Sequence, residues 1–547
     1  MTEKLLTLLT FIYGESVSAR LLEQTQQLLN QYRPRIRPQF NGLTERDSIL
    51  ITYGDQVQLT DEMPLQTLKT FCDLHLSGVI SGIHILPFYP WTSDDGFSVV
   101  DYRQIDPNLG SWDDISSMQN FRLMFDGVIN HISSQSDWFQ KFLQDDSHYK
   151  NYFITIEGEP DLSQVVRPRA LPLLTTFQTP SVEKKVWTTF SADQIDLNFK
   201  NPDVLLEILD ILLLYAERGA TFIRLDAIAY LWKEIGTTCI HLPQTHAVIQ
   251  FLRAALNEVA PHVQLITETN VPHSDNISYF GDGTNEAQLV YNFALPPLTL
   301  HTFHTGDAQT LSNWARTLTL PSDKTTFFNF LASHDGIGLN PARGILSNAD
   351  IDSLVNKVIE HGGLISYKHN ADGTQSPYEM NINYFDALSS PSGNEPLELQ
   401  VNRFIAAQAI MLSIIGMPGI YFHSLFGSRG WIEGVKQTGR NRTINREKLQ
   451  FDELQRQLAD ENSLRYKVFT KYSELLKTRS NSTAFDPHGT QIIHDLHPAV
   501  FALERISPDY QSRMLCLHNV SQKTVSFSVN EKLISLEPYQ VLWLNND

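Results

Sequence analysis

The stretch VLLEILDILLLYAERGATFIRLDA, residues 204–227, contains the pattern that decides the fold. Its first part, residues 204–219, has the composition of a buried helix, and residues 220–227 form a short apolar run that stops at Asp226. Buried parallel strands have such continuous apolar runs because helices cover both faces of their sheet. The stretch therefore predicts a helix followed by a parallel strand with an acidic residue at its carboxyl end.

The same unit recurs along the chain. Further apolar runs end in polar or acidic residues, and helix-like stretches such as residues 245–261 separate many of them. Strands and helices that alternate over roughly four hundred residues predict an α/β fold of the (β/α)₈ TIM-barrel type, whose active site lies at the carboxyl ends of the strands. The other runs are LITYGD (50–55), VISGIHILPFYPW (79–91), LMFDGVINH (123–131), VQLITET (263–269), FFNFLASHD (327–335) and MPGIYFHS (417–424).

Other segments depart from this alternation and suggest the domain organisation. Residues 1–45 contain helices without strands and predict a helical N-terminal extension ahead of a catalytic barrel at residues 46–484. Residues 133–201 (domain B) and 336–391 follow strand ends, so we expect two inserted loop subdomains over the barrel mouth. Residues 485–547 contain alternating apolar segments and predict a C-terminal antiparallel β domain.

Composition excludes several classes of function. The chain has 547 residues, of which 42% are hydrophobic and 19% charged, and a formal net charge of −19. This acidity argues against nucleic acid or an anionic membrane surface as a partner. There is no run of eighteen apolar residues that could span a membrane. We therefore expect small-molecule chemistry.

The N-terminus and the cysteines bear on location. MTEKLLTLLTFIYGESVSA has a short apolar stretch, but Glu3, Thr7 and Thr10 are unlike a signal peptide, so a helical extension is the preferred interpretation. Cys72, Cys239 and Cys516 are too few and too far apart for a disulfide framework or a zinc site. We predict a cytoplasmic protein.

Three acidic residues at successive strand ends suggest the chemistry. They are Asp226 in RLDA, Glu268 in TET and Asp335 in SHD. A single acid in such a place is usually a structural ion pair or a solvated cap, but several on one barrel face indicate a reaction centre. Retaining cleavage of a glycosidic bond uses two carboxyl groups held ~5–5.5 Å apart. The spacing therefore predicts a carbohydrate-active barrel.

Short motifs also resemble a known family. DGVINH (126–131), RLDA (224–227), Glu268 and SHD (333–335) are similar, in order, to four motifs of the α-amylase family. The N-terminal extension and stretches such as RPRALPLLT and TETNVPH resemble the glucosylglycerate phosphorylases more than the sucrose phosphorylases. The motifs that resemble the sucrose phosphorylase subfamily as a whole are YGD (53–55), PFYPWTSDDGFSVVDY (87–102), RPR (167–169), FSADQIDLN (190–198) and NRTINRE (441–447).

The resemblance implies a role for each acid. Asp226 would be the nucleophile, Glu268 the general acid and base, and Asp335 the stabiliser of the transition state. Arg224, two residues before Asp226 on the same strand face, would keep Asp226 ionised, although it could equally form a structural ion pair. Glu268 would stay protonated in drier or more negative surroundings. The glucosyl-binding residues implied are Asp55, His131, Phe190, Gln194, Arg224, Tyr230, His334 and Arg446.

Taken singly, some of these residues have simpler interpretations. The aromatic rings of Phe190 and Tyr230 fit core packing, and His131 fits a buried core histidine. The resemblance also implies that Arg169 and Tyr378 contact phosphate. Arg167 shares the inserted loop, where it could instead anchor the backbone, and arginine forks suit oxyanions.

Glu379 is a departure from the pattern, because sucrose phosphorylases have a glutamine that faces the fructosyl unit there. This exchange should weaken fructose binding and predicts another acceptor. No metal site and no cofactor are predicted, because Asp94 and Asp95 are not followed by the spaced acids of a calcium loop.

The function implied is reversible phosphorolysis of 2-O-(α-D-glucopyranosyl)-D-glycerate to α-D-glucose 1-phosphate and D-glycerate by a retaining glycosyltransferase. The expected partners are the glucoside and inorganic phosphate, without nucleic acid or membrane, and the oligomeric state stays open. The alternatives are a sucrose or sucrose 6′-phosphate phosphorylase, an α-glucosidase-type hydrolase and a non-catalytic sugar-binding relic.

Overall fold

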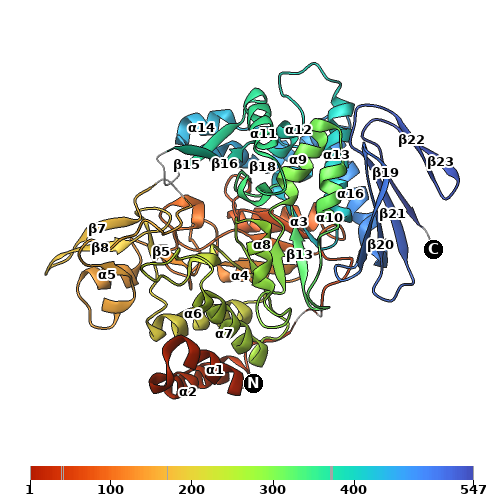
Figure 1. Ribbon diagram of the computed structural model, residues 1–547. Helices are drawn as coiled ribbons and strands as arrows, with labels where there is room; N and C mark the ends of the chain where they lie inside the picture. Colours follow the sequence, from red (N-terminus) through yellow and green to blue (C-terminus); the bar gives the residue numbers. More distant parts are fainter. Residues whose placement is uncertain (1, 39, 41, 169–170, 370–373, 546–547) are drawn as a thin grey trace.

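Parallel strands close into a barrel at the centre of the molecule (Figure 1). The computed structural model describes the chain except for residues 1, 39, 41, 169–170, 370–373 and 546–547. Neighbouring strands pair in the order β1-β17-β13-β12-β11-β10-β4-β3, which confirms the predicted fold class. The strands are β1 (Ile49–Thr52), β3 (Gly82–Ile85), β4 (Arg122–Gly127), β10 (Ala220–Leu225), β11 (Gln264–Thr267), β12 (Leu289–Tyr291), β13 (Thr326–Asn329) and β17 (Met417–Tyr421).

Apolar runs explain most of these strands. The residues of β1, β3, β4, β10, β13 and β17 are all buried, as expected for strands with helices on one side and a filled interior on the other. The strand that the pattern did not predict is β12, which has three residues and follows the polar segment 281–288. A strand this short gives too weak a run to recognise.

Helices surround the barrel and connect its strands. The helix α6 (Pro202–Glu217) starts where the Asn201 side chain accepts a hydrogen bond of 3.1 Å from the Asp203 amide, with proline at its first position. The other helices of the barrel region are α3 (Pro64–His75), α4 (Trp112–Ser116), α7 (Pro243–Val259), α8 (His273–Asn276), α9 (Leu295–Thr305), α10 (Gln309–Ala315), α13 (Leu397–Ser413), α14 (Ile432–Thr438), α15 (Phe451–Ala459) and α16 (Leu464–Ser480).

The N-terminal residues form the helices α1 (Thr2–Tyr13) and α2 (Glu15–Tyr32), which lie against the outer helices α7 and α6 (Figure 1). Tyr13 donates a hydrogen bond of 2.9 Å to the Phe199 carbonyl, and Tyr32 donates one of 2.8 Å to Asp210 on α6. These hydrogen bonds attach the two N-terminal helices to the segment before α6 and to α6 itself.

Two groups of short strands occupy the predicted insertions. Within residues 133–201 a three-stranded antiparallel sheet has the order β6-β8-β7, and β9 pairs with β5, which begins before this insertion at His131. Within residues 336–391 the strand order is β14-β16-β15. The elements are β5 (His131–Ser133), α5 (Asp137–Leu143), β6 (Thr155–Ile156), β7 (Leu174–Gln178), β8 (Glu183–Trp187), β9 (Gln194–Asp196), β14 (Ile337–Gly338), α11 (Asn348–Glu360), β15 (Leu364–His369), β16 (Gln375–Asn381) and α12 (Tyr384–Leu388).

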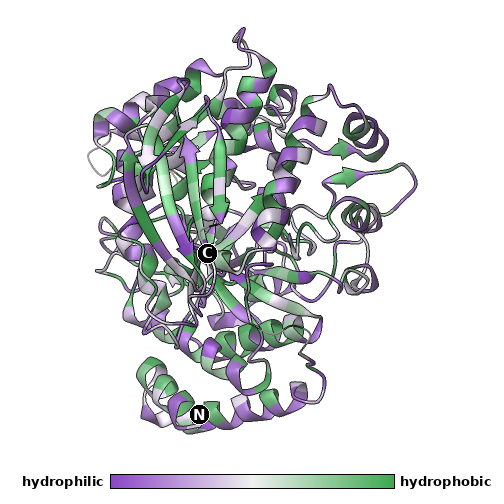
Figure 2. Ribbon diagram, turned by 90° about the vertical axis from the view of Figure 1, so that its right-hand side faces the viewer, coloured by the Kyte–Doolittle hydropathy of each residue, from purple (hydrophilic) through white to green (hydrophobic). Residues whose placement is uncertain are grey.

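Antiparallel strands end the chain. The sheet β19-β20-β21-β24 faces the viewer in Figure 2, with a separate β22-β23 hairpin. Arg505 on β20 donates a hydrogen bond of 3.0 Å to the Ser413 carbonyl at the end of α13, which joins this sheet to the barrel. None of the helices in the described part of the chain is long and apolar enough to cross a bilayer. The strands are β19 (Thr490–His497), β20 (Val500–Ile506), β21 (Arg513–Asn519), β22 (Val525–Val529), β23 (Lys532–Leu536) and β24 (Val541–Asn545), and the short pair β2 (Val57–Gln58) and β18 (Leu449–Gln450) lies in the barrel region.

Candidate active site

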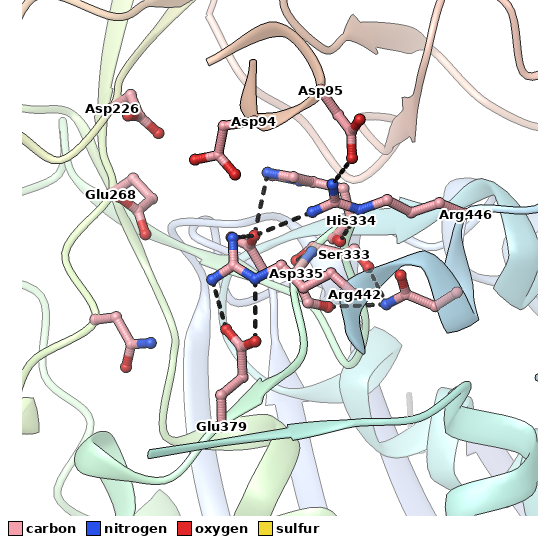
Figure 3. A network of polar contacts seen from close by, with 12 residues as sticks. Asp94, Asp95, Asp226, Glu268, Ser333, His334, Asp335, Glu379, Arg442 and Arg446 are labelled. Atoms are coloured by element: carbon pink, nitrogen blue, oxygen red, sulfur yellow. Dashed lines mark hydrogen bonds and ion pairs between the residues drawn. The ribbon is translucent and has the colours of Figure 1, made fainter. Parts of the chain in front are cut away.

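The three predicted acids line one pocket at the carboxyl ends of the strands. Leu225 on β10 pairs with Thr267 on β11, so Asp226 and Glu268 follow their strands at the same level. The Ala227 amide donates a hydrogen bond of 3.0 Å to the Glu268 carboxylate. Asp335 reaches the same pocket from the loop after β13 (Figure 3). The space between these side chains is about 740 Å³, which includes the part that is open to solvent.

Arg224 lies beneath Asp226 in a buried chain of charges. Its Nη1 donates a hydrogen bond of 2.8 Å to Asp226 and another to Asp126. Asp126 also contacts His84 Nε2 at 2.7 Å. The guanidinium thus has a second carboxylate partner behind the pocket, and it holds Asp226 in place from below. Sequence reasoning quoted Asp126 within DGVINH but gave it no role, and it missed His84.

The pKa of Asp226 differs from the expectation, whereas that of Glu268 shifts in the expected direction. Burial raises the pKa of Asp226 to about 8, although the charge of Arg224 opposes this and that of Glu268 adds to it. Burial also raises the pKa of Glu268, again against Arg224. Arg224 alone therefore does not keep Asp226 at an ordinary carboxylate pKa. Two adjacent buried carboxyls retain a proton between them near neutral pH.

Asp335 has the opposite electrostatic environment. Burial disfavours its charge, but Arg442, His334 and Arg446 outweigh burial and hold the pKa of Asp335 well below its usual range. Arg442 Nη1 lies 2.5 Å from Asp335 Oδ1, whereas Arg446 Nη2 lies 3.6 Å away. Asp335 is therefore a fixed anion, in contrast to the protonated pair opposite it (Figure 3).

Predicted sugar-binding side chains form one wall of the pocket. His131 contacts the Phe97 carbonyl at 2.9 Å through Nε2, and the Gln194 amide lies 3.1 Å from the same nitrogen. Burial lowers the pKa of His131 to about 4 and that of His334 to about 3, so both rings are neutral and can exchange hydrogen bonds with hydroxyl groups. The predicted residues that line the pocket with the acids are His131, Phe190, Gln194, Tyr230, His334 and Tyr378.

Three predicted sugar-binding residues lie outside this lining. Arg224 is underneath the pocket, as described. Asp55 forms an ion pair of 2.5 Å with Lys448. Arg446 donates a hydrogen bond of 2.7 Å to the His334 carbonyl, forms an ion pair with Asp95 and lines the neighbouring outer cavity.

The loop that carries Asp94 and Asp95 has an unusual backbone. Asp94 has a φ of 56° and Asp95 one of 51°, both in the left-handed region that side chains other than glycine rarely adopt. This conformation puts Asp94 in the pocket lining and Asp95 against Arg446. Strained backbone of this kind concentrates at functional sites. Sequence reasoning considered these two acids only as the start of a calcium loop, which it did not predict.

The predicted acceptor-binding residues lie in different parts of the structure. Tyr378 lines the pocket, and its hydroxyl accepts a hydrogen bond of 3.4 Å from the Asn270 side chain. Arg167 is exposed, with its Nη1 3.5 Å from the Leu171 carbonyl, and Arg169 lies outside the described residues. Glu379 is buried, lines the outer cavity that Arg446 also lines, and its carboxylate accepts hydrogen bonds from Arg442.

Arg442 is one of the pocket residues that sequence reasoning missed, and Phe97 and Asn270 are others. Arg442 lies within NRTINRE, where the resemblance drew attention to Arg446 alone. Within the described ranges, no three His, Cys, Asp or Glu side chains form a group that could hold a metal ion. The lining instead offers carboxylates, neutral imidazoles and a guanidinium, which suit acid–base and nucleophilic chemistry on a sugar.

Comparisons with known proteins identify the family. The α-amylase catalytic-domain model matches residues 76–338. A glucosylglycerate phosphorylase of Allomeiothermus silvanus is 50% identical over all of this chain and 98% of its own length. The chain belongs to the α-amylase family, within its glucosylglycerate phosphorylase group.

Other members of this family agree. A glucosylglycerate phosphorylase of Spirochaeta thermophila is 52% identical over 95% of this chain and 89% of its own length. The crystal structure of sucrose 6F-phosphate phosphorylase from Thermoanaerobacter thermosaccharolyticum superposes with a TM-score of 0.76 at 26% identity, covering 90% of this chain and 98% of that chain. The resemblance drawn from the motifs is confirmed.

Proposed function

We propose that this protein catalyses reversible phosphorolysis of 2-O-(α-D-glucopyranosyl)-D-glycerate, giving α-D-glucose 1-phosphate and D-glycerate. The observation that carries the proposal is the full-length identity of 50% to a glucosylglycerate phosphorylase. The pocket with its three acids supports the same reaction class. We also propose a cytoplasmic location, which the free thiols of Cys72, Cys239 and Cys516 support.

In the first half-reaction, a carboxylate oxygen of Asp226 attacks the anomeric carbon from the β face. The bond between that carbon and the glycerate oxygen breaks, and Glu268 gives its proton to the departing oxygen. The products are D-glycerate and a β-glucosyl ester of Asp226. Asp335 stabilises the positive charge that develops on the ring.

In the second half-reaction, a phosphate oxygen attacks the anomeric carbon from the α face and the ester bond to Asp226 breaks. Where the attacking phosphate oxygen carries a proton, Glu268 accepts it, so the enzyme returns to its starting state. Two inversions at one carbon retain the α configuration. We propose that Tyr378, Arg169 and Arg167 hold phosphate, and that glycerate uses the same anion site.

The test is a phosphorolysis panel at fixed phosphate concentration that follows glucose 1-phosphate. The donors are glucosylglycerate, glucosylglycerol, sucrose and sucrose 6′-phosphate. We expect rapid release from glucosylglycerate alone. Release from sucrose or its phosphate would keep the mechanism but overturn the acceptor, and free glucose at every phosphate concentration would identify a hydrolase.

The protonation of the acid pair predicts a bell-shaped pH dependence. The first half-reaction needs one ionised and one protonated carboxyl, so activity falls when the pair gains a second proton in acid or loses its last one in alkali. Since the pKa of Asp226 is raised to about 8 and that of Glu268 is also raised, we expect the alkaline limb near pH 8. The measurement is kcat/KM for glucosylglycerate, which reports this half-reaction. An alkaline limb absent up to the titration of tyrosine would contradict the shared proton.

A further inference from the structure

Arg442 occupies a bridging position between two carboxylates. Its Nη1 lies 2.5 Å from Asp335 Oδ1, while Nε and Nη2 donate hydrogen bonds of 3.0 and 2.6 Å to the two oxygens of Glu379 (Figure 3). Paired bonds of this kind fix the plane of a guanidinium as well as its distance. The orientation of the edge that faces Asp335 is therefore set by Glu379 on the opposite side.

The two carboxylates that Arg442 bridges differ in their surroundings. The Glu379 side chain is 2% exposed, whereas that of Asp335 is 22% exposed and borders the pocket. Glu379 lies on β16, whose pairing with β14 and β15 holds it in a sheet. Asp335 is on a loop. The Asn445 side chain donates a hydrogen bond of 2.9 Å to the Asp335 carbonyl and so fixes its backbone. The contact with Arg442 therefore bears on the direction of the Asp335 carboxylate, which borders the pocket.

We propose that Arg442, aligned by Glu379, is a positioning residue that holds Asp335 as an oriented anion against the sugar. The inference rests on the retaining glucosyl transfer proposed above. It gives Glu379 a role through Arg442 in place of the direct acceptor contact that the sequence suggested. A preorganised charge acts at the transition state because it needs no reorganisation when positive charge develops.

The position of Arg442 beside Asp335 predicts which reactions its removal slows. Every reaction that passes through the glucosyl–enzyme uses Asp335, whatever the acceptor. For Arg442→Ala we therefore expect kcat to fall by about 10²-fold, the loss typical of one preorganised electrostatic contact, in phosphorolysis, in synthesis from glucose 1-phosphate and in hydrolysis of α-glucosyl fluoride alike. KM for phosphate should stay within about threefold of wild type, and Arg442→Lys, which keeps the charge without the fork, should recover part of kcat.

A double-mutant cycle tests the part assigned to Glu379. Glu379→Gln alone should lower kcat, but in the Arg442→Ala background it should cost nothing further, because its partner is already absent. The double variant also removes the buried carboxylate that Arg442→Ala leaves unpaired, so it can be studied if the single variant folds poorly. Arg456→Ala is the matched control, since the Arg456 side chain on α15 is 75% exposed and pairs with Glu453; we expect its kcat to be unchanged.

Three results would overturn the proposal. A loss confined to phosphate-dependent reactions, with a raised KM for phosphate, would make Arg442 a phosphate ligand. A lower Tm with unchanged kcat per folded molecule would make it structural. Additive losses in the cycle would mean that Glu379 acts independently. Because α-glucosyl fluoride hydrolysis does not involve glycerate, it tests Arg442 even if the panel above shows another acceptor.

Discussion

Asp226→Ala is expected to lower kcat by at least ~10⁴-fold in every glucosyl transfer that the enzyme performs, because Asp226 is the nucleophile of the proposed mechanism and alanine cannot form the glucosyl ester. The protein should remain folded. Arg224 keeps its ion pair with Asp126, which also contacts His84, so the substitution strands no buried charge. It also removes a carboxyl group whose pKa burial raises. We expect Tm to change by a few degrees at most and in either direction.

The measurement is glucose 1-phosphate release under single-turnover conditions, with Tm recorded in parallel. Azide supplies the positive control, because a small anion can enter the space that the side chain vacates. It would attack from the β face and give β-glucosyl azide from α-glucosyl fluoride. Retention of more than about a tenth of wild-type kcat would remove Asp226 from the nucleophile role, as would rescue that gives the α anomer.

The barrel and two of its acids could be predicted because local sequence determines them. A strand covered on both sides has to be apolar throughout, and it ends where the chain reaches the polar mouth. Asp226 and Glu268 each follow such a strand directly, so the position of the strand gives that of the acid. Asp335 is different: sequence reasoning placed it at a strand end, whereas β13 ends at Asn329 and Asp335 lies beyond it in a loop.

The ion pairs of the site could not be predicted because they join distant parts of the chain. Glu379 and Arg442 are 63 residues apart, and Asp55 and Lys448 are 393 apart. No local pattern marks either pair, because each of these charged residues lies in a segment whose sequence is typical of a solvated loop. Sequence reasoning assigned Glu379 and Asp55 to the ligand, and the structure adds that each pairs with a cation of the protein, Arg442 and Lys448. Arg442 had a local signal, since it lies four residues before Arg446 in the same motif.

The relative pKa values of the three acids could not be predicted from the sequence either. The expectation that Arg224 keeps Asp226 ionised considered one neighbour on the same strand. The folded chain adds burial, Glu268, Asp126 and Asp335, which together outweigh that single positive charge. The desolvation of a group depends on everything around it, so it follows from the complete fold and from no single motif.

Glu268→Gln is expected to lower kcat most with those glucosyl donors whose leaving group needs a proton. With glucosylglycerate the departing oxygen is basic, so kcat should fall by about 10²–10⁴-fold, the range typical of general acid catalysis. With α-glucosyl fluoride the leaving group needs no proton. The phosphate dianion, in turn, has an unprotonated oxygen with which to attack. Transfer from fluoride to phosphate should therefore stay within about tenfold of wild type.

The oxygen of water carries two protons, and one of them must be removed by a base when water attacks. Hydrolysis of α-glucosyl fluoride should therefore fall in the same variant, while transfer to phosphate persists. The measurement is fluoride and glucose 1-phosphate release from each donor, with and without phosphate. Glutamine preserves the size of the side chain and its hydrogen bond from the Ala227 amide, so a loss that appears with one donor and not the other reports the proton alone. Equal losses with both donors would mean that Glu268 positions the sugar and that the proton comes from another group.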